Sequence, residues 1–148
     1  MSLINLGFIT TAVNRFLMGT RLFTSGAIAI GTTKSKIKTV NAINFCIDGI
    51  AYVKAATDDL FVFTDLTVQP ASSTRYYLLG LTVAGASSVT TGTATDLPDA
   101  PDGVCPIGYV KIVTSAAGTF IPATTLLDAA QVTATYVNLS CGPSAALA

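Results

Sequence analysis

The sequence contains no Glu, no His and no Trp, and its eight acidic and eight basic side chains cancel. Charged residues make up 11% of the 148 residues, against about 25% in an average soluble domain. Hydrophobic residues reach 51%. A surface with so little charge promotes association with other molecules, and it does little to keep a protein soluble as a monomer. We therefore expect other protein molecules to cover much of this surface.

The missing residue types also restrict the chemistry. Without His the chain lacks the commonest general base, the Ser-His and Cys-His pairs, and imidazole metal ligands. Without Glu, any carboxylate chemistry would depend on Asp alone, and no Gly-rich phosphate loop is present. The sequence therefore predicts a protein that is not an enzyme and that holds no cofactor or resident metal.

One acidic cluster leaves an alternative open. Asp96, Asp99 and Asp102 precede Gly103, and Ca²⁺ favours several oxygen ligands on a flexible loop. The spacing of three differs from the alternate-residue pattern of calcium-binding hands, and two prolines interrupt the segment. We interpret the cluster as a solvated loop, with an ion site as the alternative.

Long apolar segments are also missing. No stretch of about 18 uninterrupted apolar residues could form a spanning helix. Residues 1–24 have no basic leader, and Arg15 and Arg21 interrupt the place where a signal sequence would be apolar. We expect no membrane partner and no secretion.

The cysteines are few and show no motif. Cys46, Cys105 and Cys141 form an odd set without a C-x-x-C pair. Together with the lack of a secretory signal, this favours reduced thiols that pack as small hydrophobic side chains.

The residues that are abundant indicate strands. Thr, Val and Ile are frequent, and every acidic residue is Asp, which prefers turns to helix interiors. Alternating runs separated by Gly, Pro, Asp and Ser recur along residues 27–148, which we take as the body. We expect strands at 34–39, 42–47, 50–54, 60–63, 75–83, 87–93, 109–114 and 132–139. This spacing predicts an all-β fold, an antiparallel β-sandwich or barrel.

The clearest local signal is Asp48-Gly49 between two alternating runs. Asp and Gly tolerate the positive φ angles of a type I′ turn, so we predict a two-residue β-hairpin. Ile47 should then lie opposite Ile50. The core-facing side would carry Ile43, Phe45, Ile47, Ile50 and Tyr52, and the other side Asn44, Cys46 and Asp48.

Lysines alternate over residues 34–39. Lys34, Lys36 and Lys38 would give one face of a strand a basic character. We interpret this strand as a sheet edge that Lys protects against unwanted pairing, with a contact to phosphate or to an acidic partner as the alternative. The zero net charge and the few aromatics nearby argue against a nucleic-acid partner.

Residues 1–26 differ from the body. Ile9, Val13, Phe16 and Leu17 follow the spacing of one helical face. The segment is either a helix or strand on its own domain, or an apolar N-terminal arm that docks on a neighbouring subunit. Because aromatic residues and Arg are enriched at interface hot spots, the interface candidates are Leu3, Phe8, Arg15, Phe16 and Arg21.

The series of strand and turn phrases resembles small virion structural proteins of tailed bacteriophages, in particular capsid decoration (cement) proteins. The phrases lie at residues 30–39, 47–49, 52–58, 63–70, 105–114 and 133–139. This resemblance, over residues 28–139, implies a β-rich homotrimer on the outer capsid that binds the major capsid protein. It also implies location in the virion, after assembly in the host cytoplasm.

Two other functions remain open. One is a tail, baseplate or fibre-base structural subunit. The other is a carbohydrate-binding or adhesion module, although the chain has no Trp and only Tyr and Phe to stack on sugars.

Overall fold

The computed structural model describes residues 19–139, which contain ten strands and no helix. The strands are β1 (Arg21–Leu22), β2 (Ile28–Ile30), β3 (Ile37–Thr39), β4 (Ile43–Ile47), β5 (Ile50–Lys54), β6 (Thr57–Phe61), β7 (Thr74–Thr82), β8 (Ser87–Thr91), β9 (Val104–Thr114) and β10 (Val132–Asn138). The predicted all-β class is confirmed. Over the same residues, nothing has the length and apolar character of a helix that crosses a membrane.

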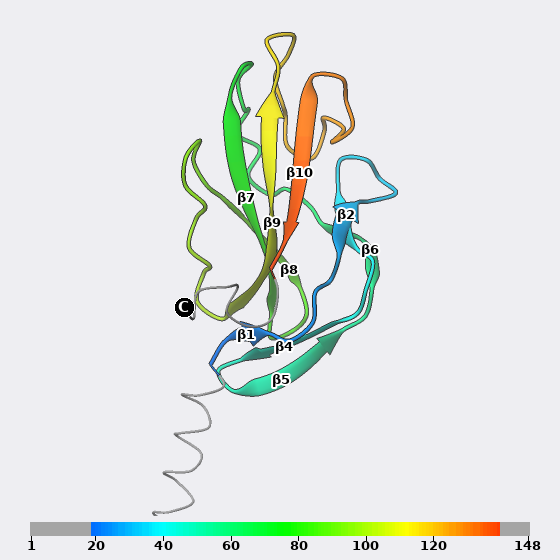
Figure 1. Cartoon of the computed structure of the whole chain (residues 1–148), viewed down its shortest axis with the longest axis vertical. Helices are drawn as coiled ribbons and strands as arrows, with labels where there is room; N and C mark the ends of the chain where they lie inside the picture. The colour runs from blue at the N-terminus through cyan, green and yellow to red at the C-terminus, as the bar shows by residue number, and fades with distance from the viewer. Residues whose placement is uncertain (1–18, 140–148) are drawn as a thin grey trace, which may run out of the picture.

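The strands form three antiparallel sheets, in the orders β10-β9-β7-β8, β1-β4-β5 and β2-β3-β6. The four-stranded sheet runs along the long axis of the molecule (Figure 1). The β1-β4-β5 sheet crosses its lower end, and the β2-β3-β6 sheet lies beside β10. This packing of sheets is consistent with the expected β-sandwich.

All three sheets contribute to one hydrophobic core. Phe63, Tyr77 and Phe120 form an aromatic group within it, with edge-to-face ring contacts at centroid distances of 4.9 to 6.3 Å. The fully buried side chains also include Ile37, Ile43, Phe45, Ile47, Phe61, Leu79, Leu81, Ile107, Val110 and Ile112. Because members of each sheet are buried together, the described residues after Gly19 fold around a common centre.

A side chain joins two of the sheets. The backbone N–H of Ile28 in β2 donates to Oδ1 of Asn138 in β10 at 2.7 Å. The backbone N–H of Leu139 donates to the carbonyl of Ile107 at 3.0 Å. The edges of β2 and β10 therefore lie against each other. The side-chain oxygen of Asn138 accepts the hydrogen bond of the Ile28 N–H, which a backbone carbonyl would accept in a paired strand.

The strand β9 begins at Val104, whereas the sequence predicts a strand that begins at residue 109. Pairing between β7 and β9 shifts register between Leu79 and Gly80, where Gly80 lies opposite Pro106. A β-bulge accommodates a proline, which has no N–H for the ladder. A Cβ atom on Gly80 would come within 2.3 Å of Val104, so the close approach of the two strands requires glycine.

The lysine strand is the main error of the sequence prediction. Lys34 and Lys36 lie in a turn before β3, and β3 is the central strand of its sheet rather than an edge. The turn closes through the N–H of Lys36, which donates to Thr33 O at 2.8 Å. Lys34 pairs with Asp128 at 3.5 Å, and Lys36 lies 3.9 Å from Asp59. Two of the three lysines are therefore held in ion pairs of this domain.

Candidate interaction surface

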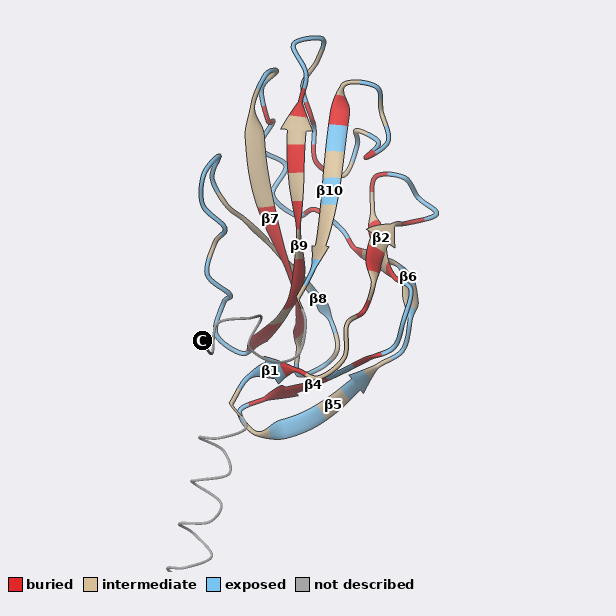
Figure 2. Ribbon diagram, viewed as in Figure 1, coloured by how far each residue is buried: buried red, intermediate tan, exposed pale blue. Residues whose placement is uncertain are grey.

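The β1-β4-β5 sheet ends in an exposed strand. Among residues 19–139, β5 pairs with β4 on one side and with no strand on the other. Val53 is 73% exposed, the most of any large hydrophobic side chain described, and Ile50 is 52% exposed. Figure 2 shows that most of β5 is exposed, in contrast to β4 beside it. This strand is the apolar feature of the surface that most needs explanation.

The hairpin before β5 forms as the sequence predicts. Asp48 and Gly49 have φ angles of 51° and 80°, and Ile47 pairs with Ile50. In a hairpin of this type, the closing pair exchanges hydrogen bonds and the next pair does not. The N–H and C=O groups of Ala51 and Val53 therefore point away from β4, toward the open side of the sheet.

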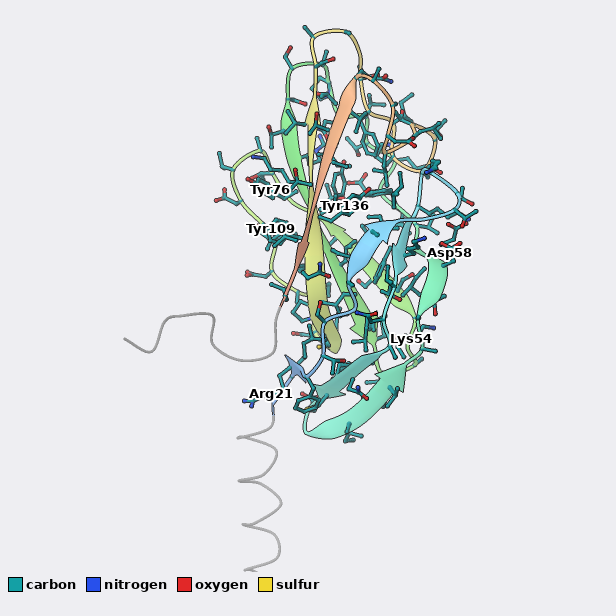
Figure 3. All side chains as sticks on the ribbon, turned by 45° about the vertical axis from the view of Figure 1, so that its right-hand side comes forward. Arg21, Lys54, Asp58, Tyr76, Tyr109 and Tyr136 are labelled. Carbon is teal, nitrogen blue, oxygen red and sulfur yellow. The ribbon has the colours of Figure 1, made fainter. Side chains whose placement is uncertain are left out.

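The register of the sheet places Arg21 on the same face as Ala51 and Val53 of β5. Arg21 pairs with Cys46, and Cys46 with Ala51, so these three share one face with Val53 two positions along. Arg21 is exposed and extends away from the body (Figure 3). We call the set Arg21, Asn44, Ala51 and Val53 the β5 surface.

The structure describes one of the five predicted interface residues. Arg21 lies on the β5 surface, whereas Leu3, Phe8, Arg15 and Phe16 are outside the described residues. β1 lies in the segment 1–26 that the sequence separates from the body, yet its Leu22 belongs to the core. Gly19 also accepts a hydrogen bond from the N–H of Gly49 at 3.3 Å. The chain therefore enters the fold directly beside the hairpin turn.

The opposite face of this sheet is anchored in the core. Ile43, Phe45 and Ile47 are fully buried. Tyr52 is half-buried and its ring stacks on Phe45, with centroids 5.5 Å apart. Lys54 at the end of β5 approaches the turn at Gly85. The β5 surface is thus the outer side of a fixed sheet.

Two side chains of the hairpin differ from the prediction. Ile50 was expected in the core but is exposed, because it lies next to the turn, at the end of the sheet. Cys46 was expected on the solvent face but is buried, because β1 covers it and its Sγ donates to Gly19 O at 2.7 Å. The periodicity of the sequence predicts on which face of the sheet a side chain lies, but not which other elements cover that face.

Both described cysteines are buried, as expected of thiols that pack as small hydrophobic side chains. Cys105 is a free thiol, and Cys46 is buried beside β1. Burial raises the pKa of the Cys105 thiol to about 11, with a further contribution from Cys46. Thiolate is the reactive form of cysteine, so this environment keeps Cys105 inert. Cys141 lies outside the described residues.

Hydroxyl and carboxylate groups fasten the 31–36 turn to β6. The backbone N–H groups of Thr32 and Thr33 donate to Asp58 at 3.1 Å and to Asp59 at 3.0 Å, and both hydroxyls donate to the same carboxylates. Hydrogen bonds from the Thr32 side chain and backbone lower the pKa of Asp58. The carboxylates of Asp58 and Asp59 therefore hold the 31–36 turn against β6.

The acidic loop is exposed at Asp96, Asp99 and Asp102. Asp96 accepts a hydrogen bond from the Thr95 hydroxyl at 2.8 Å and another from the Thr93 hydroxyl at 3.4 Å. In the described part of the chain, no three acidic, Cys or His side chains are grouped as metal ligands would be.

A second feature, half-buried at the surface, lies on the four-stranded sheet. Tyr76 and Tyr109 lie on the face opposite the buried Tyr77, with ring centroids 6.0 Å apart (Figure 3). Lys111 lies over the Tyr76 ring, 5.9 Å from its centroid. The strand expected at 75–83 puts Tyr76 and Tyr77 on opposite faces by alternation, but local sequence could not pair Tyr76 with Tyr109, because that depends on the register between β7 and β9.

The β5 surface was also missed, although its signal is present in the sequence. Ala51 and Val53 are apolar at positions that the hairpin assigns to the face away from the core.

No protein-family model, no curated protein and no solved structure matches this chain. The resemblance to virion proteins therefore stays a prediction.

Proposed function

We propose that this protein is a non-enzymatic structural protein of a tailed-bacteriophage virion that decorates and cements the outer capsid surface as a homo-oligomer. The observation that carries the proposal is a charge-poor β-domain that leaves the β5 surface, including Val53 at 73% exposure, uncovered. Contiguous apolar patches exposed on a monomer are typical of surfaces that other proteins cover. The resemblance over residues 28–139 supplies the kind of partner.

The proposed action is stabilisation by binding. A protein that binds the assembled shell, and not its separated subunits, stabilises the assembly by mass action. A homotrimer, as the resemblance implies, would engage several sites on the major capsid protein at once and so gain avidity. No reacting group is needed for this function, only complementary surfaces.

The β5 surface and the N-terminal segment are adjacent in the fold, which favours a joint contact. Gly19, where the description of the chain begins, accepts a hydrogen bond from the N–H of Gly49, the second residue of the β4–β5 turn. Arg21 follows on β1. We expect the part of the predicted arm that precedes Arg21 to dock on the shell beside it.

Mixing the full chain with purified expanded shells tests the proposal. We expect saturable co-sedimentation and a higher disruption temperature of the shell. Arg21→Asp should weaken binding by about tenfold, since a lost interfacial Arg commonly costs more than 1 kcal/mol. Lys111→Asp on the four-stranded sheet is the matched control. A chain that never co-sediments with shells contradicts the proposal.

The alternatives predict different results. A tail or baseplate subunit would be found by antibody labelling of virions at the tail, as a ring or needle. A carbohydrate-binding module is favoured by the pair Tyr76 and Tyr109, since tyrosines at a surface can stack on sugar rings. A saturable hit on a glycan array, lost in Tyr76→Ala, would support that function instead.

A further inference from the structure

We propose that two copies of this chain associate through antiparallel pairing of their β5 strands about a two-fold axis at Tyr52. The contact would join the two β1-β4-β5 sheets into one continuous sheet. It concerns a two-fold contact between two copies in the absence of any shell, distinct from the homotrimer that the resemblance implies, and so goes beyond the proposed function.

The first argument is that β5 is the one sheet edge without a neighbour among residues 19–139. Each of the three sheets has two edge strands. The edge strand β1 lies against β9, β2 lies against β10, and β6 lies against β8. In contrast, β5 makes extensive contact only with β4. An open edge presents unpaired backbone groups, which are a template for another strand.

The second argument is the absence of the usual protection. Edge strands are commonly guarded by proline, by bulges or by charged side chains in mid-strand. β6 shows such features, because it carries Asp58 and Asp59 and Asp59 has a φ of 52°. β5 has no proline and pairs with β4 without a register shift. Its one charge, Lys54, is at its end.

The third argument is that the edge is complementary to itself. Ala51 and Val53 direct their N–H and C=O groups outward, on either side of Tyr52. With the two-fold axis at Tyr52, Ala51 of each copy exchanges both backbone hydrogen bonds with Val53 of the other. Every outward backbone group between these positions then has a partner.

The side chains fit the same register. On the outer face the large Val53 lies opposite the small Ala51 of the second copy. On the inner face Lys54 lies opposite Ile50, so the pairing brings no like charges face to face. The zero net charge of the chain adds no long-range repulsion between copies. A second copy is therefore the partner that this edge fits best.

The test measures the mass of the full chain against concentration by light scattering and sedimentation. We expect wild type to show twice the mass of the Val53→Lys variant at high concentration, with self-association weakened at least tenfold, since the variant would bring two cations onto one face of the joined sheet and a lysine in mid-strand guards an edge against pairing. Val40→Lys is the matched control, because Val40 is 54% exposed but lies outside β5. It should associate like wild type.

A second variant separates backbone pairing from side-chain burial. Val53→Pro removes an outward N–H that β4 does not use, and proline is tolerated on edge strands. We expect the melting temperature of Val53→Pro to stay close to that of wild type at low concentration, where the copies are dissociated. The doubling of mass at high concentration should be lost. The amide protons of Ala51 and Val53 should exchange slowly in wild type at high concentration and rapidly after dilution.

Equal masses of wild type and Val53→Lys at all concentrations would overturn the inference. So would fast exchange at Ala51 and Val53 in the associated protein, because another surface would then join the copies. Failure to bind shells bears only on the proposed function, since none of these measurements includes a shell.

Discussion

Phe45 and Tyr52 stack across the β4–β5 hairpin, with ring centroids 5.5 Å apart and planes inclined by 26°. Phe45 is fully buried, whereas Tyr52 is half-buried. The pair holds the inner face of the hairpin on the core. Because side chains alternate along a strand, the same contact turns Ala51 and Val53 outward. The β5 surface is thus a consequence of how this hairpin is anchored.

The stacking pair should show measurable coupling. Phe45→Ala should lower the free energy of unfolding by about 3 to 5 kcal/mol, as is usual for a buried Phe. Tyr52→Ala should cost less, because its ring is half-exposed. A double-mutant cycle should give a coupling energy of about 0.5–1.5 kcal/mol in denaturant titrations. Strictly additive effects would contradict the stacking interaction.

The hairpin turn should be sensitive to β-branching. Gly49 has a φ of 80°, a conformation that β-branched residues resist. Gly49→Val should therefore lower the free energy of unfolding by about 1–3 kcal/mol. Gly49→Asn is the control, because Asn tolerates positive φ and should lower the melting temperature less. An unchanged melting temperature in the Val variant would refute the turn.

The link between β2 and β10 depends on an acceptor at Asn138. Asn138→Leu keeps a similar volume but leaves the Ile28 N–H without its partner at 2.7 Å. We expect a loss of about 1–3 kcal/mol in unfolding free energy. Asn138→Asp retains an acceptor oxygen and should lose less. Faster exchange of the Ile28 amide proton in the Leu variant would identify the affected bond.

Acid should weaken the fastening of the 31–36 turn. The Thr32 side chain and backbone lower the pKa of Asp58 below 3.8 in the folded state. A group with a depressed folded pKa adds stability above its unfolded pKa, and this stability is lost as pH falls through the folded value. Asp58→Asn should thus lower the melting temperature at neutral pH.

The comparison across pH separates this effect from a general one. The difference between wild type and Asp58→Asn should shrink as the pH falls below 3.8, because protonated Asp58 resembles Asn. Asp102→Asn in the exposed loop is the control and should change little at either pH. A difference that stays constant down to about pH 2 would contradict the role of the ionised carboxylate.

The buried thiol should resist alkylation in the folded protein. At pH 8 a thiol with a pKa of about 11 is ionised in only about one molecule in a thousand. We expect mass spectrometry to find Cys105 unmodified by iodoacetamide in native protein and rapidly modified in denaturant. Rapid native labelling of Cys105 would be inconsistent with its burial.

Some elements were predictable because their determinants are local. The Asp48-Gly49 turn and the pairing of Ile47 with Ile50 follow from the φ preferences of the turn residues and from alternation. Of the basic strand expected at 34–39, only residues 37–39 form a strand, because residues 31–36 close a turn that Asp58 and Asp59 hold and that Lys34 joins to Asp128. Asp128 is far away in sequence, and no local pattern contains that partner.

The β5 surface was likewise predictable only in part. The outward positions of Ala51 and Val53 could be derived from the hairpin, since alternation and the turn type fix them. Their exposure could not, because it depends on which strands cover which sheet edges. Cys46 shows the converse, since the turn assigns it to the outer face and β1 then buries it.

The sequence by itself determined an all-β chain, a specific hairpin and a surface poor in charge. These follow from composition and short-range conformational preferences. Only the tertiary structure decided that β1, β2, β6, β8 and β10 face other strands while β5 remains open among the described residues. The physical reason is that an edge is satisfied by residues distant in sequence, whose register is set by packing of the whole core.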